Sequence, residues 1–396
     1  MAIDSGLIEG LYQDLDGATR ARVDEVVDGL CEAKEENGRV CVVTGSGPNL
    51  HEGVTTLIAE LIRKGIVDGV STSSAVVAHE MAGCLERVLR VSGEELGIDH
   101  GLLPADGKFE ITLCDDGIIE SISREIDIDI ELIGRARDIK GDEIIKAAGN
   151  MSYPVGFRTE RISREVCAIA RSKGLSFEEV AGAGSDPMTM IGAGAEKDVP
   201  VLVTVPQLVG GGSVGMDIAD STGMRERSRR VADLLAGSDV IIESALALAQ
   251  EVHDGPFETY TGHGIWSGWD GEEVYRLLGK KLVRIDLDPN LELAWQKERE
   301  SREVQEAVAK GLPKTKLMGI PFRMEMSGFA RLPGSLPIVG DIGRIWPIIG
   351  YMSTERLGIK LDFMSYPQET GAGKSMRDWI VDNVGILDRD RMLAVR

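Results

Sequence analysis

The stretch Val40-Cys-Val-Val-Thr-Gly-Ser-Gly-Pro-Asn-Leu-His-Glu-Gly-Val-Thr-Thr-Leu57 decides the expected fold. A short β-branched run enters a turn that holds Gly45 and Gly47, and an amphipathic segment follows at once, which is the order of a strand, a turn and a helix. The dinucleotide fingerprint GxGxxG would need a third glycine where Leu50 stands, and the nearest one is Gly53. A plain glycine turn and a phosphate site therefore both stay open for this stretch.

The rest of the chain alternates short β-branched runs with amphipathic segments. The patterns predict strands at 39–44, 66–71, 200–205, 239–244 and 282–286, and helices at 54–64, 75–88 and 223–236. Such alternation is typical of a parallel sheet covered by helices on both faces. The expected fold class is therefore α/β, a Rossmann-like doubly wound parallel sheet, with a helical N-terminal segment and a C-terminal extension.

Three parts are expected along the chain. Residues 1–38 form a helical lead-in that ends at Asn37-Gly38, and residues 39–300 form the α/β domain with the ligand site. Residues 301–396 form an extension in which glycine and proline recur from Gly311 to Gly350. The apolar content of this extension indicates that it packs on the main domain or on a partner subunit.

Composition narrows the possible partners. The 44 basic and 65 acidic residues give a net charge of −21, which repels phosphate backbones, so no nucleic-acid partner is expected. No apolar run reaches the length of a membrane span and the N-terminus lacks the order of a signal peptide, so a cytoplasmic protein without membrane contact is expected. The five cysteines and five histidines show no zinc-ligand spacing, so no metal site is expected.

Ligands of doubly wound sheets bind beyond the carboxyl ends of the strands, so the residues just after each strand are the site candidates. After the first strand, Gly45, Ser46, Gly47 and Asn49 offer backbone donors and small polar groups that suit a pyrophosphate at a helix N-terminus.

The second loop carries hydroxyls ahead of a possible acid–base pair. Thr72, Ser73 and Ser74 precede a segment that contains His79 and Glu80. A histidine among apolar neighbours can be a core or interface residue as well as a catalytic one, and both interpretations stay open.

Later loops add five more candidates at three places. Gly211 and Gly212 belong to a glycine triplet after a strand, which indicates either a connector or a backbone that a ligand approaches closely. Asp286 ends a strand, where an acid is suited to hold the two hydroxyls of an adenosine ribose. Between them lie Glu243 and His253, for which a catalytic role is one of two open interpretations.

Together these loops resemble a known family. The segment 46–68, continued by Thr72-Ser-Ser-Ala-Val-Val-Ala-His-Glu-Met81, resembles the deoxyhypusine-synthase-like NAD fold, and most of all its LOR/SDH branch of NAD-dependent ornithine cyclodeaminases. That branch carries a loop of small residues followed by a histidine–acid pair, which His79-Glu80 matches. The resemblance continues through 197–204, 210–212, 237–242 and 283–290.

The resemblance implies NAD as the cofactor and assigns roles. Gly45, Ser46, Asn49, Thr72, Ser73 and Asp286 would contact NAD, with Gly47, Ser74, Gly211 and Gly212 beside them. His79, Glu80 and the residues after Glu243 would border the substrate, which would be a small amine or amino acid. Sites of this family commonly form between subunits, so a homo-oligomer, dimer or tetramer, is expected.

The expected reaction is therefore a redox-neutral deamination. Hydride would leave a C–N carbon and return from NADH after ammonia is lost, with His79 or His253 as base and Glu80 or Glu243 holding the substrate ammonium. The segment 242–251 lacks the lysine that forms the covalent imine in deoxyhypusine synthase, which disfavours transfer to a protein lysine. The alternatives are an NAD-dependent dehydrogenase, a deoxyhypusine- or homospermidine-synthase-like aminobutyl transferase, and a non-catalytic NAD-binding scaffold.

Overall fold

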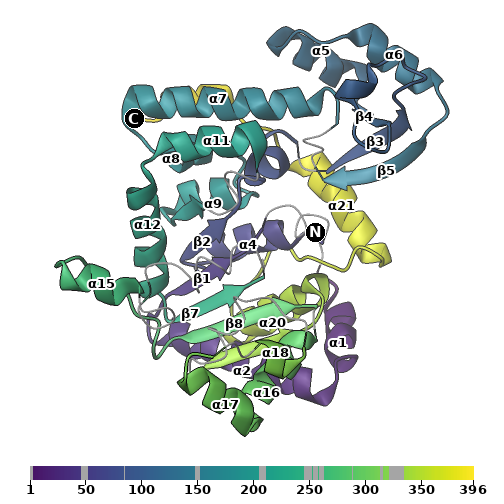
Figure 1. Ribbon diagram of the computed structural model, residues 1–396. Coiled ribbons are helices and arrows are strands. Elements are labelled where there is room, and N and C mark those ends of the chain that lie inside the picture. Colours follow the sequence, from purple (N-terminus) through teal and green to yellow (C-terminus); the bar gives the residue numbers. More distant parts are fainter. Residues whose placement is uncertain are drawn as a thin grey trace.

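The computed structural model describes residues 3–45, 52–83, 85–147, 152–204, 211–244, 252, 257, 263–287, 289–312, 315–320 and 334–396. Its centre is a six-stranded sheet in which every neighbouring pair of strands is parallel (Figure 1). The strands, from one edge to the other, are β6 (Val201–Val203), β2 (Gly69–Thr72), β1 (Val40–Val43), β7 (Val240–Glu243), β8 (Lys281–Asp286) and β9 (Ser335–Val339). Helices flank this sheet, which confirms the expected doubly wound α/β fold.

The order of the strands shows how the sheet is wound. When these six strands are numbered as they follow one another in the chain, their order across the sheet is 3-2-1-4-5-6. The chain therefore builds outward from β1 through β2 to β6, and then crosses back to add β7, β8 and β9 on the other side. This is the strand order of dinucleotide-binding Rossmann sheets, and the direction of winding reverses between β1 and β7.

Alternate residues of each strand enter two different cores. Val40 and Val42 point into the larger core, which includes side chains of α2 (Gly17–Glu35), α4 (Val54–Arg63) and α20 (Ile342–Arg356). Cys41 and Val43 point into a smaller core that includes side chains of α12 (Met224–Ala236). This two-sided burial explains why the strands appear in the sequence as nearly continuous apolar runs.

A second sheet stands beside the first. The antiparallel strands β4 (Lys108–Thr112), β3 (Leu85–Ser92) and β5 (Asp142–Ala147) pack with α5 (Asp116–Glu125) and α6 (Ile130–Asp138) around a core of their own. The helix predicted at 75–88 is therefore wrong in its second half, because a short π-helical turn, η1 (Val77–Met81), gives way to β3. Pairing with β4 and β5, both distant in the sequence, decides the conformation of this segment.

Residues of the expected C-terminal extension complete the main sheet. Strand β9 pairs with β8, and the side chain of Trp346 in α20 is buried in the larger core. Further on, α21 (Gly371–Asn383) and α22 (Arg389–Ala394) flank a segment in which Leu387 N donates to Met81 O over 2.9 Å. The last part of the chain thus supports the loop region that follows β2.

The remaining helices surround these cores. They are α1 (Ser5–Gln13), η2 (His100–Leu102), α7 (Val155–Lys173), α8 (Phe177–Gly184), α9 (Met190–Lys197), α11 (Gly212–Ser221), α15 (His263–Trp269), α16 (Asn290–Glu300), α17 (Arg302–Ala309) and α18 (Thr315–Met318). Within the described ranges, none of the helices has both the length and the apolar character that crossing a bilayer requires.

Candidate functional site

The carboxyl ends of the six parallel strands meet along one edge of the sheet, called the carboxyl edge below. At the centre of this edge, Thr44 N donates to Ser71 O over 2.9 Å and Ser244 N donates to Val43 O over 2.8 Å. The hydroxyl oxygens of Thr44 and Ser244 lie 3.0 Å apart, so they join β1 to β7 just beyond the ends of the two strands. This is the point where the winding of the sheet reverses, and where ligands of such sheets bind.

The sheet face that covers the smaller core becomes polar at this edge. Cys41, Ile241 and Leu282 form an apolar row across β1, β7 and β8. Two residues further along, Glu243 of β7 is the register partner of both Val43 and Arg284, so the side chains of Glu243 and Arg284 emerge on the same face. Both side chains are only 1% exposed. Charged groups buried side by side at a strand end are typical of a ligand site rather than of a structural core.

Several polar atoms at this edge are buried without a hydrogen bond to any described residue. Ser71 Oγ, Thr72 Oγ1 and the two terminal nitrogens of Arg284 have no hydrogen-bond partner in the part of the chain that the structure describes. Folded proteins satisfy nearly all of their buried polar atoms, so a cluster of exceptions calls for a specific explanation. A bound polar ligand would supply the missing partners.

Asp286 stands where the sequence predicts an acid for a ribose. It ends β8, its side chain is 16% exposed, and its backbone oxygen accepts a hydrogen bond from Gly340 N over 2.9 Å. Thr72 lies at the same edge on the other side of β1, three strand spacings away, which corresponds to about 14 Å. The two predicted cofactor contacts therefore lie on opposite sides of the point where the winding reverses.

The structure separates the roles of His79 and Glu80. Both belong to η1, but His79 is half-buried while Glu80 is buried against the start of α9, where its Oε2 accepts a hydrogen bond from Ile191 N over 3.3 Å. Burial raises the pKa of Glu80 to about 8, against the opposing effect of hydrogen bonds from the backbone of Ile191 and Met190. A carboxyl that is neutral at pH 7 does not suit the ammonium-binding role that the sequence predicts for Glu80.

The other predicted site residues fall into two groups. Gly45 follows Thr44 beyond β1, Ser73 and Ser74 are buried just beyond β2, and Gly211 and Gly212 lie at the start of α11, the helix after β6. Ser46, Gly47, Asn49 and His253 lie outside the described residues. The structure thus brings Gly45, Thr72, Ser73, Ser74, Glu243 and Asp286 to one edge of the sheet.

Sequence reasoning missed three polar residues of this edge: Thr44, Ser244 and Arg284. A signal for Arg284 was available, because it is a charged residue in the middle of the otherwise apolar run Leu282-Val-Arg-Ile285. Such a residue in a central strand is buried, and a buried charge needs a partner. The hydroxyl residues carry no comparable signal, since threonine and serine are common at strand ends.

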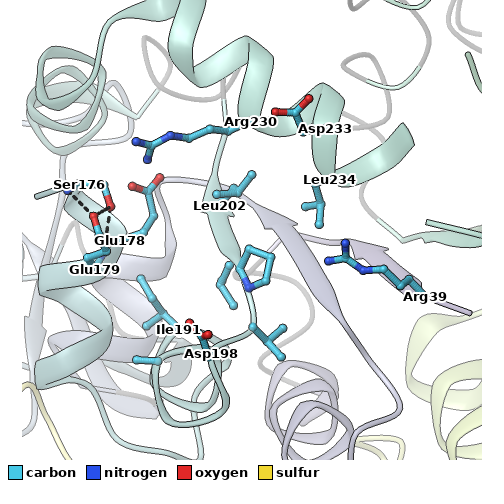
Figure 2. A pocket seen from close by; sticks show the side chains of 15 residues that line it. Arg39, Ser176, Glu178, Glu179, Ile191, Asp198, Leu202, Arg230, Asp233 and Leu234 are labelled. Carbon is cyan, nitrogen blue, oxygen red and sulfur yellow. Dashed lines mark hydrogen bonds between the residues drawn. The ribbon is translucent and has the colours of Figure 1, made fainter. Parts of the chain in front are cut away.

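A cavity of about 520 Å³ lies elsewhere, lined by residues of α8, α9, α12 and the edge strand β6 (Figure 2). Figure 2 shows Arg230 and Asp233 of α12 on one side of this cavity and Ile191 of α9 on the other. Its floor includes Pro200 and Val201, at the end of β6 opposite to the carboxyl edge. The cavity is therefore separate from the candidate site.

Comparisons with known proteins give distant similarities. No family model matches the chain, and no curated protein matches it. Among solved structures, the chain is similar to ArgZ, an arginine dihydrolase from the ornithine-ammonia cycle in cyanobacteria, at 12% identity and a TM-score of 0.41 over 84% of this chain and 31% of that chain. It is similar to AgrE in a ternary complex with ornithine and NAD+ at 12% identity and a TM-score of 0.41, over 87% of this chain and 34% of that chain.

A third similar structure is a conserved LOR/SDH protein from Methanococcus maripaludis S2, at 11% identity and a TM-score of 0.38, over 90% of this chain and 70% of that chain. The chain spans about a third of the length of the ArgZ and AgrE chains.

Proposed function

We propose that this chain is an NAD-dependent enzyme that acts on the C–N bond of a small amine or amino acid. The observation that carries the proposal is the strand order 3-2-1-4-5-6 with buried polar side chains where the winding reverses. Sheets wound in this order bind dinucleotides at that point. The class of substrate follows from the sequence resemblance around His79-Glu80 and from the buried carboxylate of Glu243.

The residues at the carboxyl edge fit a dinucleotide. Asp286 ends a strand, where its carboxylate suits ribose hydroxyls, and the hydroxyls of Thr72 and Ser73 suit phosphate oxygens at the end of β2. Thr72 Oγ1 is buried and lacks a hydrogen-bond partner within the described ranges, as expected of an atom that a ligand would satisfy. When bound, NAD would accept a hydride from the C–N carbon and return it later.

The chain's own groups divide the remaining tasks. Glu243 holds the substrate ammonium, because its carboxylate lies at the centre of the carboxyl edge and its exclusion from water strengthens the attraction. His79 is the candidate base, since it is half-buried and lies on the turn after β2. Glu80 is a neutral acid at pH 7 and suits the donation of a proton rather than the binding of a cation.

The first test is to identify the small molecules that the purified protein releases when it is denatured. We expect NAD at about one molecule per chain, or, if NAD is lost during purification, saturable binding when it is added back. Asp286→Asn is the matched variant, because it keeps the shape of the side chain and removes the charge that would hold the ribose. Absence of NAD together with absence of binding would exclude the proposed function.

The second test separates the enzyme classes. Small amines and amino acids are supplied to the NAD-loaded protein while ammonia and NADH are both followed. Release of ammonia without accumulation of NADH supports the redox-neutral deamination. Steady accumulation of NADH identifies an ordinary dehydrogenase, and NAD binding without any turnover identifies a scaffold.

A further inference from the structure

We propose that Arg284 is an oxyanion-binding residue, which holds a carboxylate or phosphate group of the ligand end-on through Nη1 and Nη2. The inference rests on the proposed function only in placing the ligand at the carboxyl edge. The sequence resemblance spans this residue, within 283–290, but it assigns no role to Arg284, and the predicted contacts do not include it.

The position of Arg284 is unusual for a charged side chain. It lies in β8, between Val283 and Ile285, which both point into the larger core. Arg284 points to the opposite face, beside Glu243 of β7, and belongs to the largest fully buried side chains of the protein. A guanidinium stays protonated at any physiological pH, so this position keeps a full positive charge out of water.

The contacts of the guanidinium leave one side of it open. Its Nε lies 4.0 Å from Oδ2 of Asp286, two residues further along β8. Nη1 and Nη2 are buried and have no hydrogen-bond partner in the described part of the chain. The charge therefore has a carboxylate near one side, while the two terminal nitrogens have unused donors.

Arg227 of α12 shows how this fold satisfies a buried arginine that has a structural role. Its Nη1 donates to Glu178 Oε1 over 2.9 Å and to Val203 O over 2.7 Å. Its Nη2 donates to Ile218 O over 3.0 Å and to Ser221 Oγ over 3.1 Å. Both arginines are nearly inaccessible to solvent, but among the described residues only Arg227 has partners for its terminal nitrogens, so burial alone does not explain why those of Arg284 are unpaired there.

The geometry of the open side selects the ligand chemistry. Two parallel N–H groups of a guanidinium match the two oxygens of a carboxylate or of a phosphate, and they repel cations. Glu243 and Asp286 lie nearby, so a ligand whose oxyanion lies beside a cationic or hydroxyl group fits the whole cluster. Two sources of the oxyanion meet this description: the carboxylate of an amino acid and a phosphate of the dinucleotide.

The experiment measures binding to the full chain by calorimetry, with pairs of probes that differ in one oxyanion. L-lysine is compared with cadaverine, which lacks the carboxylate. NAD is measured together with nicotinamide mononucleotide and nicotinamide riboside, which differ from each other in one phosphate. The variants are Arg284→Met, which removes the charge, and Arg284→Lys, which keeps the charge and removes the paired donors. Arg227→Lys is the control for replacing a buried arginine away from the site.

We expect both Arg284 variants to bind one oxyanion-bearing probe about tenfold to hundredfold more weakly than the wild type, as the loss of a charge-assisted pair of hydrogen bonds implies. The probe without the oxyanion should bind all proteins alike. A loss confined to L-lysine identifies a carboxylate site, and a loss confined to NAD identifies a phosphate site. If Arg284→Met does not fold, Arg284→Lys provides the measurement.

Two results overturn the inference: binding of both oxyanion-bearing probes to Arg284→Lys at wild-type affinity, or no binding of either probe to the wild-type protein. Two further outcomes distinguish the oxyanion site from the proposed NAD-dependent function. Wild-type affinity of the Arg284 variants for both L-lysine and NAD, with intact turnover, refutes the oxyanion site but supports the NAD-dependent enzyme. If L-lysine binds in a way that depends on Arg284 and NAD does not bind at all, the oxyanion site is supported and the proposed NAD-dependent function is refuted.

Discussion

The buried carboxyl of Glu80 makes the stability of this protein depend on pH in a direction opposite to that of a salt-bridged acid. Its pKa rises from the ordinary 4.5 to about 8 in the folded chain, because burial against α9 disfavours the ionised form. Between these two values the folded chain holds a proton that the unfolded chain has released. The free energy of unfolding therefore falls as pH rises through this window.

The size of the effect follows from the two pKa values. At about 1.4 kcal/mol per pH unit, a rise from 4.5 to about 8 amounts to about 5 kcal/mol of lost stability well above pH 8, of which about 4 kcal/mol is lost between pH 4 and pH 8. Glu80→Gln keeps the shape and stays neutral at every pH. We expect the variant to match the wild type near pH 4.5 and to become more stable than it by an amount that grows up to pH 8, where it approaches about 4 kcal/mol.

The assay is urea unfolding of both proteins at four pH values between 4.5 and 8, with the free energies extrapolated to zero denaturant. Glu179→Gln is the control, because hydrogen bonds from the backbone and side chain of Ser176 lower the pKa of Glu179. Its substitution should destabilise the chain at neutral pH, with a difference that shrinks as the pH falls. A difference between Glu80→Gln and the wild type that stays constant with pH would refute the assignment of Glu80 as a neutral buried acid.

Three further predictions follow from the structure. Asp286→Asn should weaken NAD binding, measured by calorimetry, about tenfold or more through loss of charge-assisted hydrogen bonds. Trp346→Ala should lower the free energy of unfolding by about 3 to 5 kcal/mol, because the Trp346 side chain is 1% exposed in the larger core. Trp266 is 68% exposed, so Trp266→Ala should change the free energy of unfolding by no more than about 0.5 kcal/mol. Arg227→Met should lower the free energy of unfolding by about 3 to 5 kcal/mol, because it removes the cation that lies 2.9 Å from the buried carboxylate of Glu178. An unchanged urea midpoint would show that this ion pair does not stabilise the fold.

Much of the main sheet could be predicted from the sequence, because its signals are local. The runs that form β1, β7 and β8 are mostly apolar and end at polar residues, and the predicted bounds agree with the structure to within one residue at each end. Helix α4 has an apolar face of helical period and was predicted equally closely. Such elements can be predicted without knowing which segments they pack against.

Strand β3 and strand β9 could not be predicted in the same way. The residues of β3 continue an apolar spacing that also suits a helix, and only the two partner strands, far away in the sequence, favour the extended form. Strand β9 lies in a region rich in glycine and proline, and pairing with β8 makes it the sixth strand of the main sheet. Contacts between distant segments decide both cases.

The candidate site also has features that the sequence predicts and features that depend on contacts between distant segments. The sequence by itself determined that polar residues such as Thr72, Glu243 and Asp286 follow strands, and parallel strands bring such residues to one edge. Only the tertiary structure decided that Arg284 lies beside Glu243 with its terminal nitrogens unpaired within the described residues, and that α9 covers Glu80. The physical reason is that register, burial and desolvation depend on which segments meet, and a local pattern carries no information about them.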